Sequence, residues 1–136
     1  METTEKEEVK YTLHKPEGYQ KVALPGLTKW VQALRSGNYQ QGTGSLHENG
    51  QYCCLGVLCE TQGRLVGGSD GGETRTRLHV KNPLYATLSG CGSLPYVITV
   101  SISGGHHYRQ LTYLNDTLHL TFPQIADILE EVYFEP

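Results

Sequence analysis

The stretch Thr121-Phe-Pro-Gln-Ile-Ala-Asp-Ile-Leu-Glu-Glu-Val132 carries the clearest structural signal in the sequence. Thr121 and Gln124 form the Thr-x-x-Gln pattern, in which each side chain satisfies a backbone donor at the start of a helix. Pro123 suits the first turn, where its missing N–H costs no hydrogen bond. Apolar residues then recur on one face, at Phe122, Ile125, Ala126, Leu129 and Val132. The stretch predicts a helix over residues 122–132 with one face in the core.

Two more helices are expected upstream of this one. Residues 27–36 place Leu27, Trp30, Val31 and Leu34 on one stripe, and Gly37 follows as the residue that favours a helix end. The run Cys54-Leu-Gly-Val-Leu-Cys-Glu-Thr-Gln62 predicts a short helix that stops at Gly63.

Strands are expected between the helices. Apolar and polar residues alternate in 9–14 and in 96–102, which is the pattern of a half-buried strand. Asn49-Gly50 is the dipeptide most typical of a tight β-hairpin turn. The expected strands are 9–14, 19–24, 43–48, 51–54, 75–80 and 96–102.

The length of 136 residues suits a single domain. We expect residues 1–8 to form a solvated, charged tail and residues 9–136 to form one small α+β domain. Its mostly antiparallel sheet, with two to four helices packed on it, is expected to contain 9–14, 43–54 and 96–102.

The charge balance and the short apolar runs exclude several classes of partner. A formal net charge of -3 gives no basic surplus for duplex DNA or RNA, although two or three cations suffice for a small anion. The longest apolar runs are about five residues, against the roughly 20 that a membrane span needs, so we expect no membrane partner. The N-terminus lacks the apolar core of a signal peptide, which predicts a cytoplasmic protein.

A reducing cytoplasm predicts that Cys53, Cys54, Cys59 and Cys91 remain thiols. A structural zinc site favours Cys-x-x-Cys pairs, whereas Cys54 and Cys59 on one helix point about 140° apart. We therefore expect buried apolar cysteines and no metal. Zinc binding and a cysteine nucleophile near the helix start, activated by a histidine, are the alternatives.

The familiar fingerprints of hydrolases, zinc proteases, P-loop proteins and Rossmann enzymes are missing from the sequence. We expect no catalytic residues and no cofactor. Asp127, Glu130 and Glu131 are carboxylates on adjacent turns of the last helix, and they are better explained as its solvated outer face than as a catalytic pair.

The segment Gly104-Gly-His-His-Tyr-Arg109 is the most suggestive polar cluster. His106, His107 and Arg109 offer donors to a phosphate, and Tyr108 offers a stacking face. The alternative is an ordinary turn with exposed polar residues.

Two further groups are candidates for ligand binding. Arg75 and Arg77 would share one face of a strand, as an anion platform or as charges that protect a sheet edge. Arg35, Tyr39 and Gln41 would project from a helix–strand junction into a pocket, or would simply pack around the end of the helix.

Three stretches together are similar to a known group of proteins. They are Trp30-Val-Gln-Ala-Leu-Arg-Ser-Gly37 continued by Tyr39, Gln41, Gly44 and Leu46; Cys53-Cys-Leu-Gly-Val-Leu-Cys59; and Leu114-Asn-Asp116 followed by Phe122, Ile125, Ala126 and Asp127. In this order they resemble small proteins of phages and prophages, usually without assigned function. The resemblance covers about 27–60 and 111–131 and carries over no site residue.

By class, small phage proteins without catalytic motifs include sponges that sequester nucleotide alarm signals of host defence. The resemblance thus implies a phage anti-defence protein, acting in the host cytoplasm, that binds a cyclic nucleotide or a cyclic ADP-ribose-like signal without turnover. We expect a homo-oligomer with the site at a subunit interface. The alternatives are an inhibitor or accessory factor docking on a host or phage protein, and a small hydrolase or transferase using His106, His107 and Arg109.

Overall fold

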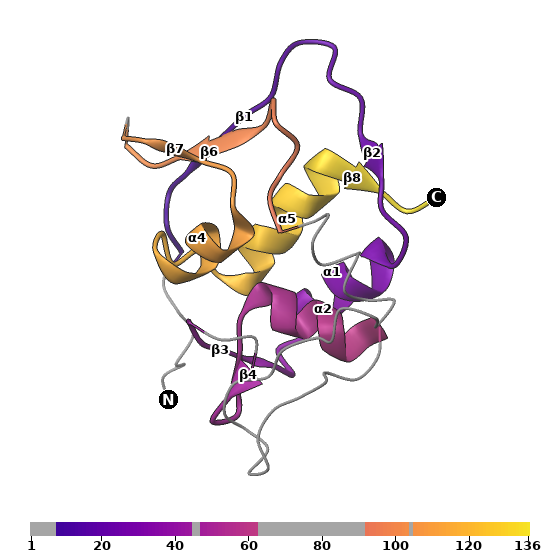
Figure 1. Ribbon diagram of the computed structural model, residues 1–136, viewed down its shortest axis with the longest axis vertical. Coiled ribbons are helices and arrows are strands. Elements are labelled where there is room, and N and C mark those ends of the chain that lie inside the picture. The colour runs from indigo at the N-terminus through magenta and orange to yellow at the C-terminus, as the bar shows by residue number, and fades with distance from the viewer. Residues whose placement is uncertain (1–7, 45–46, 63–91, 104) are drawn as a thin grey trace.

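The computed structural model describes residues 8–44, 47–62, 92–103 and 105–136. In this part of the chain, four helices lie at the centre and short strands lie around them (Figure 1). The helices are α1 (Leu27–Arg35), α2 (Cys54–Gln62), α4 (Leu111–Asp116) and α5 (Phe122–Val132). The strands are β1 (Thr12–His14), β2 (Val22–Ala23), β3 (Gln40–Gln41), β4 (His47–Glu48), β5 (Gln51–Tyr52), β6 (Thr99–Ser101), β7 (His107–Tyr108) and β8 (Tyr133–Phe134). The predicted α+β class, with two to four helices, is confirmed.

Helix α5 begins where its capping pattern predicted. The Thr121 hydroxyl accepts a hydrogen bond from the Gln124 amide at 3.2 Å, and Gln124 Oε1 accepts one from the Thr121 amide at 3.0 Å. The same glutamine donates from Nε2 to the carbonyl of Val9 at 2.6 Å. One side chain therefore caps the helix and also holds the N-terminal segment against it.

Helices α1 and α5 pack together through the two predicted apolar stripes. Trp30 and Ile125 are fully buried, and Leu34 is 2% exposed. Burying an aliphatic side chain of this size contributes about 1.5–3 kcal/mol to folding. Gly37 has a φ of 80°, the left-handed conformation that ends α1 where the sequence predicted.

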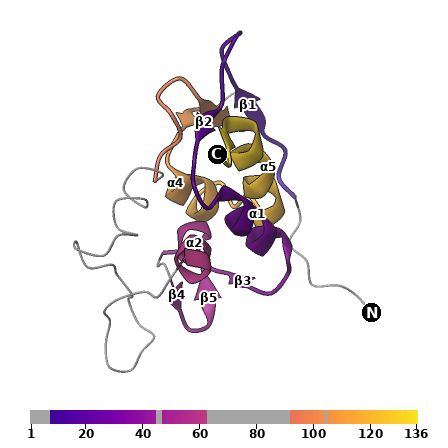
Figure 2. The same ribbon diagram turned by 90° about the vertical axis from the view of Figure 1, so that its right-hand side faces the viewer.

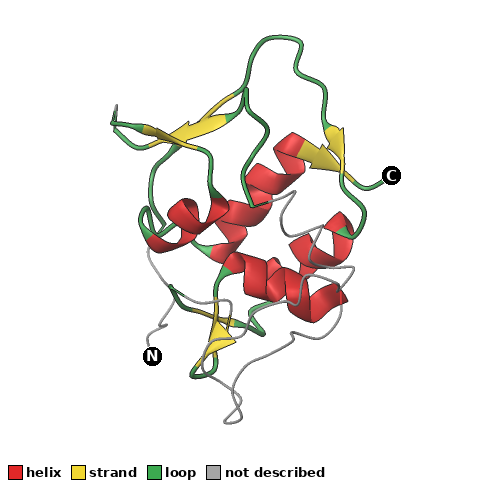
Figure 3. Ribbon diagram, in the orientation of Figure 1, coloured by secondary structure: helices red, strands yellow, loops and turns green. Residues whose placement is uncertain are grey.

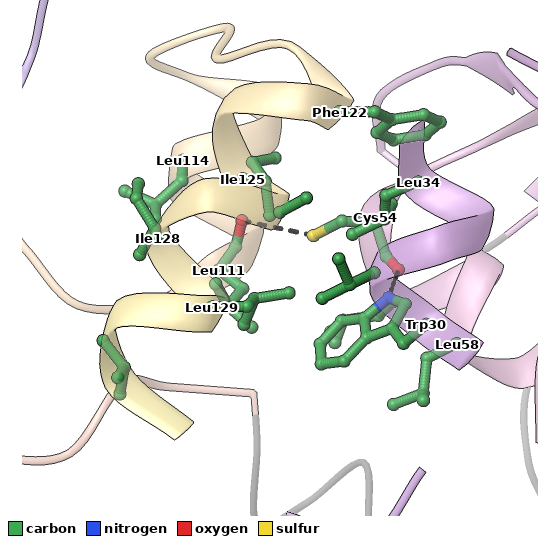
Figure 4. Packing of buried hydrophobic residues seen from close by; sticks show 14 of the residues in the cluster. Trp30, Leu34, Cys54, Leu58, Leu111, Leu114, Phe122, Ile125, Ile128 and Leu129 are labelled. Atoms are coloured by element: carbon green, nitrogen blue, oxygen red, sulfur yellow. Dashed lines mark hydrogen bonds between the residues drawn. The ribbon is translucent and has the colours of Figure 1, made fainter. Parts of the chain in front are cut away.

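Helix α2 is buried along its first two turns, from Cys54 to Cys59, because it packs against both α1 and α4. The indole Nε1–H of Trp30 donates to the carbonyl of Cys54 at 2.9 Å, a hydrogen bond inside the core. Cys54 Sγ points the other way, toward the carbonyl of Leu111 at 3.9 Å (Figure 4). The predicted helix over 54–62 is confirmed, and Cys53, Cys54 and Cys59 are buried, as expected.

The strands form three small sheets, so the expected single sheet containing 9–14, 43–54 and 96–102 is wrong. Strand β6 lies between β1 and β7 in an antiparallel sheet. Strand β5 lies between β3 and β4, on the opposite side of the helices from β6 (Figure 3). Strands of two or three residues form too few hydrogen bonds to build one large sheet, and each group instead covers a different side of the helices.

The hairpin at Asn49-Gly50 is confirmed. Asn49 and Gly50 have φ values of 55° and 79°, as a two-residue turn with left-handed backbone requires, and they join β4 to β5. The expected strand over 75–80 lies outside the described residues, as do Cys91 and residues 1–7 of the expected tail.

The parallel pair of β2 and β8 was not predicted. It brings the C-terminal Glu135 to the start of α1, which has Gly26 as its N-cap and no local side-chain cap. The Glu135 carboxylate accepts hydrogen bonds from the Thr28 amide at 2.7 Å and the Gly26 amide at 3.0 Å. A carboxylate from the other end of the chain therefore caps α1.

This cap makes stability depend on pH. The hydrogen bonds from Thr28 and Gly26 hold the pKa of Glu135 below its ordinary value. A carboxylate with a lowered pKa in the folded state stabilises that state above the unfolded pKa, which is about 4.3 for glutamate. This contribution is lost as the pH falls through that value and below it.

Glu135→Gln should therefore lower the melting temperature at pH 7 more than at pH 3, because pH 3 lies below the unfolded pKa and part of the carboxylate's contribution is already lost there. Thermal unfolding followed by circular dichroism at the two pH values measures the difference. Glu17→Gln, in an exposed turn, is the control for loss of one charge. An equal effect of Glu135→Gln at both pH values would contradict the proposed cap.

Candidate functional site

Arg35, Tyr39 and Gln41 meet at one hollow, as one reading of the sequence expected. The hollow has a volume of about 410 Å³ and lies between the end of α1 and the start of α5. Its wall is completed by Glu8, Leu34, Gly37, Thr121, Phe122 and Pro123. We call it the Tyr39 hollow.

The charge of Arg35 is balanced by two carboxylates of the same chain. Its Nη2 lies 2.6 Å from Asp127 Oδ1 and 2.9 Å from Glu130 Oε1. Hydrogen bonds to Glu130 and Asp127 raise the pKa of Arg35 above its ordinary value. The hydrogen bond from Arg35 lowers the pKa of Glu130. Arg35 thus has two carboxylate partners on α5 already, and Glu8 adds a further negative charge at the Tyr39 hollow.

These carboxylates belong to the outer face predicted for α5. Asp127, Glu130 and Glu131 are exposed, as expected, and they also hold cations from other elements. Besides the Arg35 pair, Glu131 lies 2.6 Å from Lys15 Nζ. Pairs of this exposure contribute about 0–1 kcal/mol each, so they orient α5 rather than stabilise it strongly.

The side chain of Gln41 is fully used by hydrogen bonds within the protein. Its Nε2 donates to Asn115 Oδ1 at 2.8 Å and to the carbonyl of Leu120 at 2.9 Å. Its Oε1 accepts from the amide of Phe122 at 3.2 Å, at the start of α5. Gln41 therefore fixes the wall of the hollow and offers no free donor to a ligand.

Asn115 and Asp116 complete this network. The Nδ2 group of the fully buried Asn115 donates to the carbonyl of Gly42 and to Asp116 Oδ1, at 2.8 and 2.7 Å. Asp116 Oδ2 in turn accepts from the amide of Gly44 at 3.2 Å. We call these contacts the Gln41–Asn115 lock. The Gln41-x-x-Gly44 and Leu114-Asn-Asp116 stretches, far apart in the sequence, are thus bonded to each other.

The second candidate cluster lies on the edge strand β7. His106 and His107 are exposed, and Arg109 is partly exposed. Neighbouring residues of an extended strand point to opposite faces, so His107 and Arg109 share one face and Tyr108 takes the other. Tyr108 packs on the core and meets Tyr113 edge to face, with ring centroids 5.5 Å apart.

Arg109 is held by an aromatic ring. Its Cζ lies 5.1 Å from the centroid of Tyr96, and that tyrosine is 82% exposed. Within the described residues, no carboxylate forms an ion pair with Arg109. A guanidinium over an aromatic ring keeps its charge and its N–H donors available.

Two histidines lie on the same face of this sheet. The rings of His14 and His107 stack with centroids 4.4 Å apart. His14 Nε2 bonds the Ser101 hydroxyl at 2.7 Å, and His107 Nδ1 bonds the Thr99 hydroxyl at 2.9 Å. The hydroxyls of β6 thus orient an imidazole from each neighbouring strand. We call the surface formed by His14, Tyr96, His107 and Arg109 the β7 face.

Sequence reasoning missed His14 and Tyr96 as members of this site. Both strands were expected, but nothing in the sequence indicated that β1 pairs with β6 in the register that sets His14 opposite Thr99. The one available signal for His14 was the alternation of apolar and polar residues in 9–14, which predicted the strand that carries it. Arg75 and Arg77 lie outside the described residues.

The cysteines form no metal site in the part of the chain that the structure describes, where no three His, Cys, Asp or Glu side chains come close enough to hold an ion. Burial raises the pKa of the Cys53 thiol. A raised pKa keeps the thiol protonated and weakly nucleophilic.

More than half of the sequence is similar to a described protein family. A family model described as a domain of unknown function, DUF8296, matches residues 27–98, which is more than half of the 136 residues. The chain belongs to the DUF8296 family. No curated protein and no solved structure gives a significant match. In this DUF8296 protein, the matched segment contains α1, α2, Gln41 and Tyr96, and it ends before Arg109.

The described helices of this DUF8296 protein have between 6 and 11 residues. None of them combines the length and the apolar character that crossing a bilayer requires.

Asn115→Ala should destabilise this DUF8296 protein, because the Gly42 carbonyl and the Gln41 Nε2 group both lose a partner. Each buried polar group left unpaired costs about 1–3 kcal/mol. Urea denaturation measures the change in the free energy of unfolding. Asn38→Ala, an exposed asparagine after α1, should leave the unfolding curve unchanged. Equal stability of the two variants would show that the Gln41–Asn115 lock does not hold the fold.

Proposed function

We propose that the protein binds a small, nucleotide-like anion at the β7 face and releases it unchanged. The observation that carries the proposal is the stacking of Arg109 on the exposed ring of Tyr96. Of the two arginines in the described residues, Arg35 is paired with two carboxylates, whereas Arg109 has no ion pair there. Its guanidinium is therefore the better cation for a phosphate.

The neighbours of Arg109 suit the other parts of such a ligand. Within the described residues, His107 uses Nδ1 for the Thr99 hydroxyl, which leaves Nε2 for a ligand oxygen. Tyr96 exposes enough of its ring for a base to stack on it. A phosphate, a ribose and a base would thus find a cation, an imidazole and an aromatic ring on the β7 face.

Two hydroxyls lie beside the imidazoles, and the hydroxyl of Thr99 bonds His107 Nδ1 at 2.9 Å, a contact between β6 and β7. The position of the other hydroxyl, on Ser101, favours binding without turnover. Ser101 is bonded to His14, but it is 4% exposed and lies on the strand beneath the stacked imidazoles. A nucleophile needs room for the reacting atom beside it and for the oxyanion that develops. A small hydrolase or transferase is therefore the weaker candidate.

The resemblance to phage proteins supports a biological role for this binding. A protein that sequesters a nucleotide-derived signal of host immunity, such as a cyclic nucleotide or a cyclic ADP-ribose isomer, needs affinity and no chemistry. The net charge of -3 suits a small anion held by a few local donors better than a polyanion.

Arg109→Ala should weaken ligand binding about ten- to a hundredfold, because a hydrogen bond to a charged group contributes about 1.5–3 kcal/mol. The melting temperature of the ligand-free variant should equal that of the wild type. Titration calorimetry with cyclic dinucleotides, cyclic trinucleotides and cyclic ADP-ribose isomers gives the dissociation constants. Lys29→Ala, an exposed cation on α1, is the matched control and should bind like the wild type.

Two results would overturn this function. If no compound of the panel binds the wild type more tightly than about 10 μM, a sponge for these signals is excluded. If the ligand recovered after incubation is cleaved or modified, the protein is an enzyme. Tyr96→Ala tests the stacking separately, since loss of one stacked base costs about 1–3 kcal/mol.

A further inference from the structure

The sheet of β1, β6 and β7 has one face on the core and one face turned outward. Leu13, Val100 and Tyr108, one residue from each strand, belong to the core or pack against it. Alternate residues of a strand point to opposite faces, so the neighbours of these three residues point away from the core. Figure 2 shows β1 at the end of the molecule opposite β4 and β5. The outward side of this sheet carries the two stacked imidazoles of the β7 face.

The two imidazoles reach diagonally across β6 from its two sides. His14 is paired in register with Thr99, but its ring bonds the hydroxyl of Ser101. His107 is paired with Ser101, but its ring bonds the hydroxyl of Thr99. The rings therefore meet above β6, with their centroids 4.4 Å apart and their planes 24° apart. A hydrogen bond from β6 thus fixes each ring of the stack.

These hydrogen bonds are compatible with both protonation states of the rings. A hydroxyl can donate to a neutral imidazole nitrogen or accept from a protonated one. Histidine is also the side chain whose charge normally changes between about pH 5 and pH 8. Protonation therefore adds positive charge to the β7 face without breaking the contacts that orient the rings.

The protein supplies no counter-ion for two positive charges on this stack. In the part of the chain that the structure describes, neither His14 nor His107 has a carboxylate within ion-pair distance. Arg109, on the same face of β7, adds a permanent positive charge. Like charges at such a short separation repel each other even in water. A second proton on the stack is therefore disfavoured while the β7 face is empty.

The other charged groups around the sheet do not offset this repulsion. Strand β6 contains no charged residue, and the neighbour of the stack on β7 is another histidine, His106. Lys10 and Lys15 lie on either side of β1, and Lys15 is paired with Glu131 of α5 at 2.6 Å. Glu17 lies in the exposed turn after β1, and within the described residues it forms no ion pair with an imidazole. An anion from outside the protein is thus the natural partner of the doubly protonated stack.

We propose that the His14–His107 stack couples anion binding at the β7 face to proton uptake. At about pH 6 the empty stack holds one proton, and a small anion binds together with the second. The anion offsets the repulsion between the rings and bonds Arg109 as well. Binding therefore strengthens as the pH falls from about 8 to about 6. This inference rests on the proposed function and names its regulation, and a phosphodiester suits it because its charge does not change in that range.

NMR of the histidine rings in the full chain tests the coupling, with sulfate as the probe because its charge is also constant in this range. The wild type should bind sulfate about tenfold more tightly at pH 6 than at pH 8, since one proton taken up with the anion changes the binding constant by up to about tenfold per pH unit. Sulfate should also move the ring titrations of His14 and His107 to higher pH. The titration of His119, an exposed histidine elsewhere, should not move.

Variants separate the stack from a single histidine. His14→Gln, which keeps a side chain able to bond Ser101, should lose part of the pH dependence. The double variant His14→Gln/His107→Gln should bind sulfate through Arg109 with nearly the same strength at both pH values. His119→Asn is the matched control and should behave like the wild type. If the double variant fails to fold, the movement of the wild-type ring titrations with sulfate decides the matter.

Three results would overturn the coupling. Equal binding of sulfate by the wild type at pH 6 and pH 8 would leave the proposed function standing without this regulation. Full pH dependence in His14→Gln would assign it to His107 alone, and full dependence in the double variant would assign it to His106. Failure of sulfate to bind at pH 6 would also overturn the coupling, and the calorimetric panel of cyclic nucleotides then shows separately whether the proposed function stands.

Discussion

The hydrogen bond between the side-chain amides of Gln41 and Asn115 joins two parts of the chain that are 74 residues apart. On one side of it lie α1 and the β3–β5 sheet, and on the other lie α4 and the start of α5. Asn115 is fully buried, so every one of its polar atoms must find a partner inside the protein. The partners it finds, at Gly42 and Asp116, determine where the turn after β3 lies against α4. The packing of α2 between these two parts depends on that placement.

The sequence predicted the local structure well and the long-range structure poorly. Three helices and the Asn49-Gly50 turn follow from apolar spacing, caps and backbone preferences, which act within a few residues. The pairing of β2 with β8 and the division into three sheets depend on contacts more than a hundred residues apart or on strands of two residues. Such short strands have no alternation to detect. Helix α4 was missed as a separate element for the same reason, since it spans only six residues.

The candidate site shows the same limit in its chemistry. The meeting of Arg35, Tyr39 and Gln41 was foreseen, because they follow one another around a helix end. The sequence did not predict that the side chains of Arg35 and Gln41 are already bonded within the protein, because their partners lie on α5 and α4. On the β7 face, a contiguous His-His-Tyr-Arg run supplied His107 and Arg109, whereas His14 and Tyr96 came from elsewhere. Polar residues in a motif therefore divide into those that hold the fold together and those left available to a ligand, and only their partners distinguish the two.

The use of C-terminal residues to complete N-terminal structure affects how the chain folds during synthesis. Glu135 caps α1, β8 pairs with β2, and the Tyr19 hydroxyl donates to the carbonyl of Val132 at 2.8 Å. Until these last residues have left the ribosome, α1 has an uncapped start and the apolar face that α5 will cover is open to water. The nascent chain therefore emerges with this surface exposed, and α1 is capped and covered only after residues 122–135 have followed it out of the ribosome.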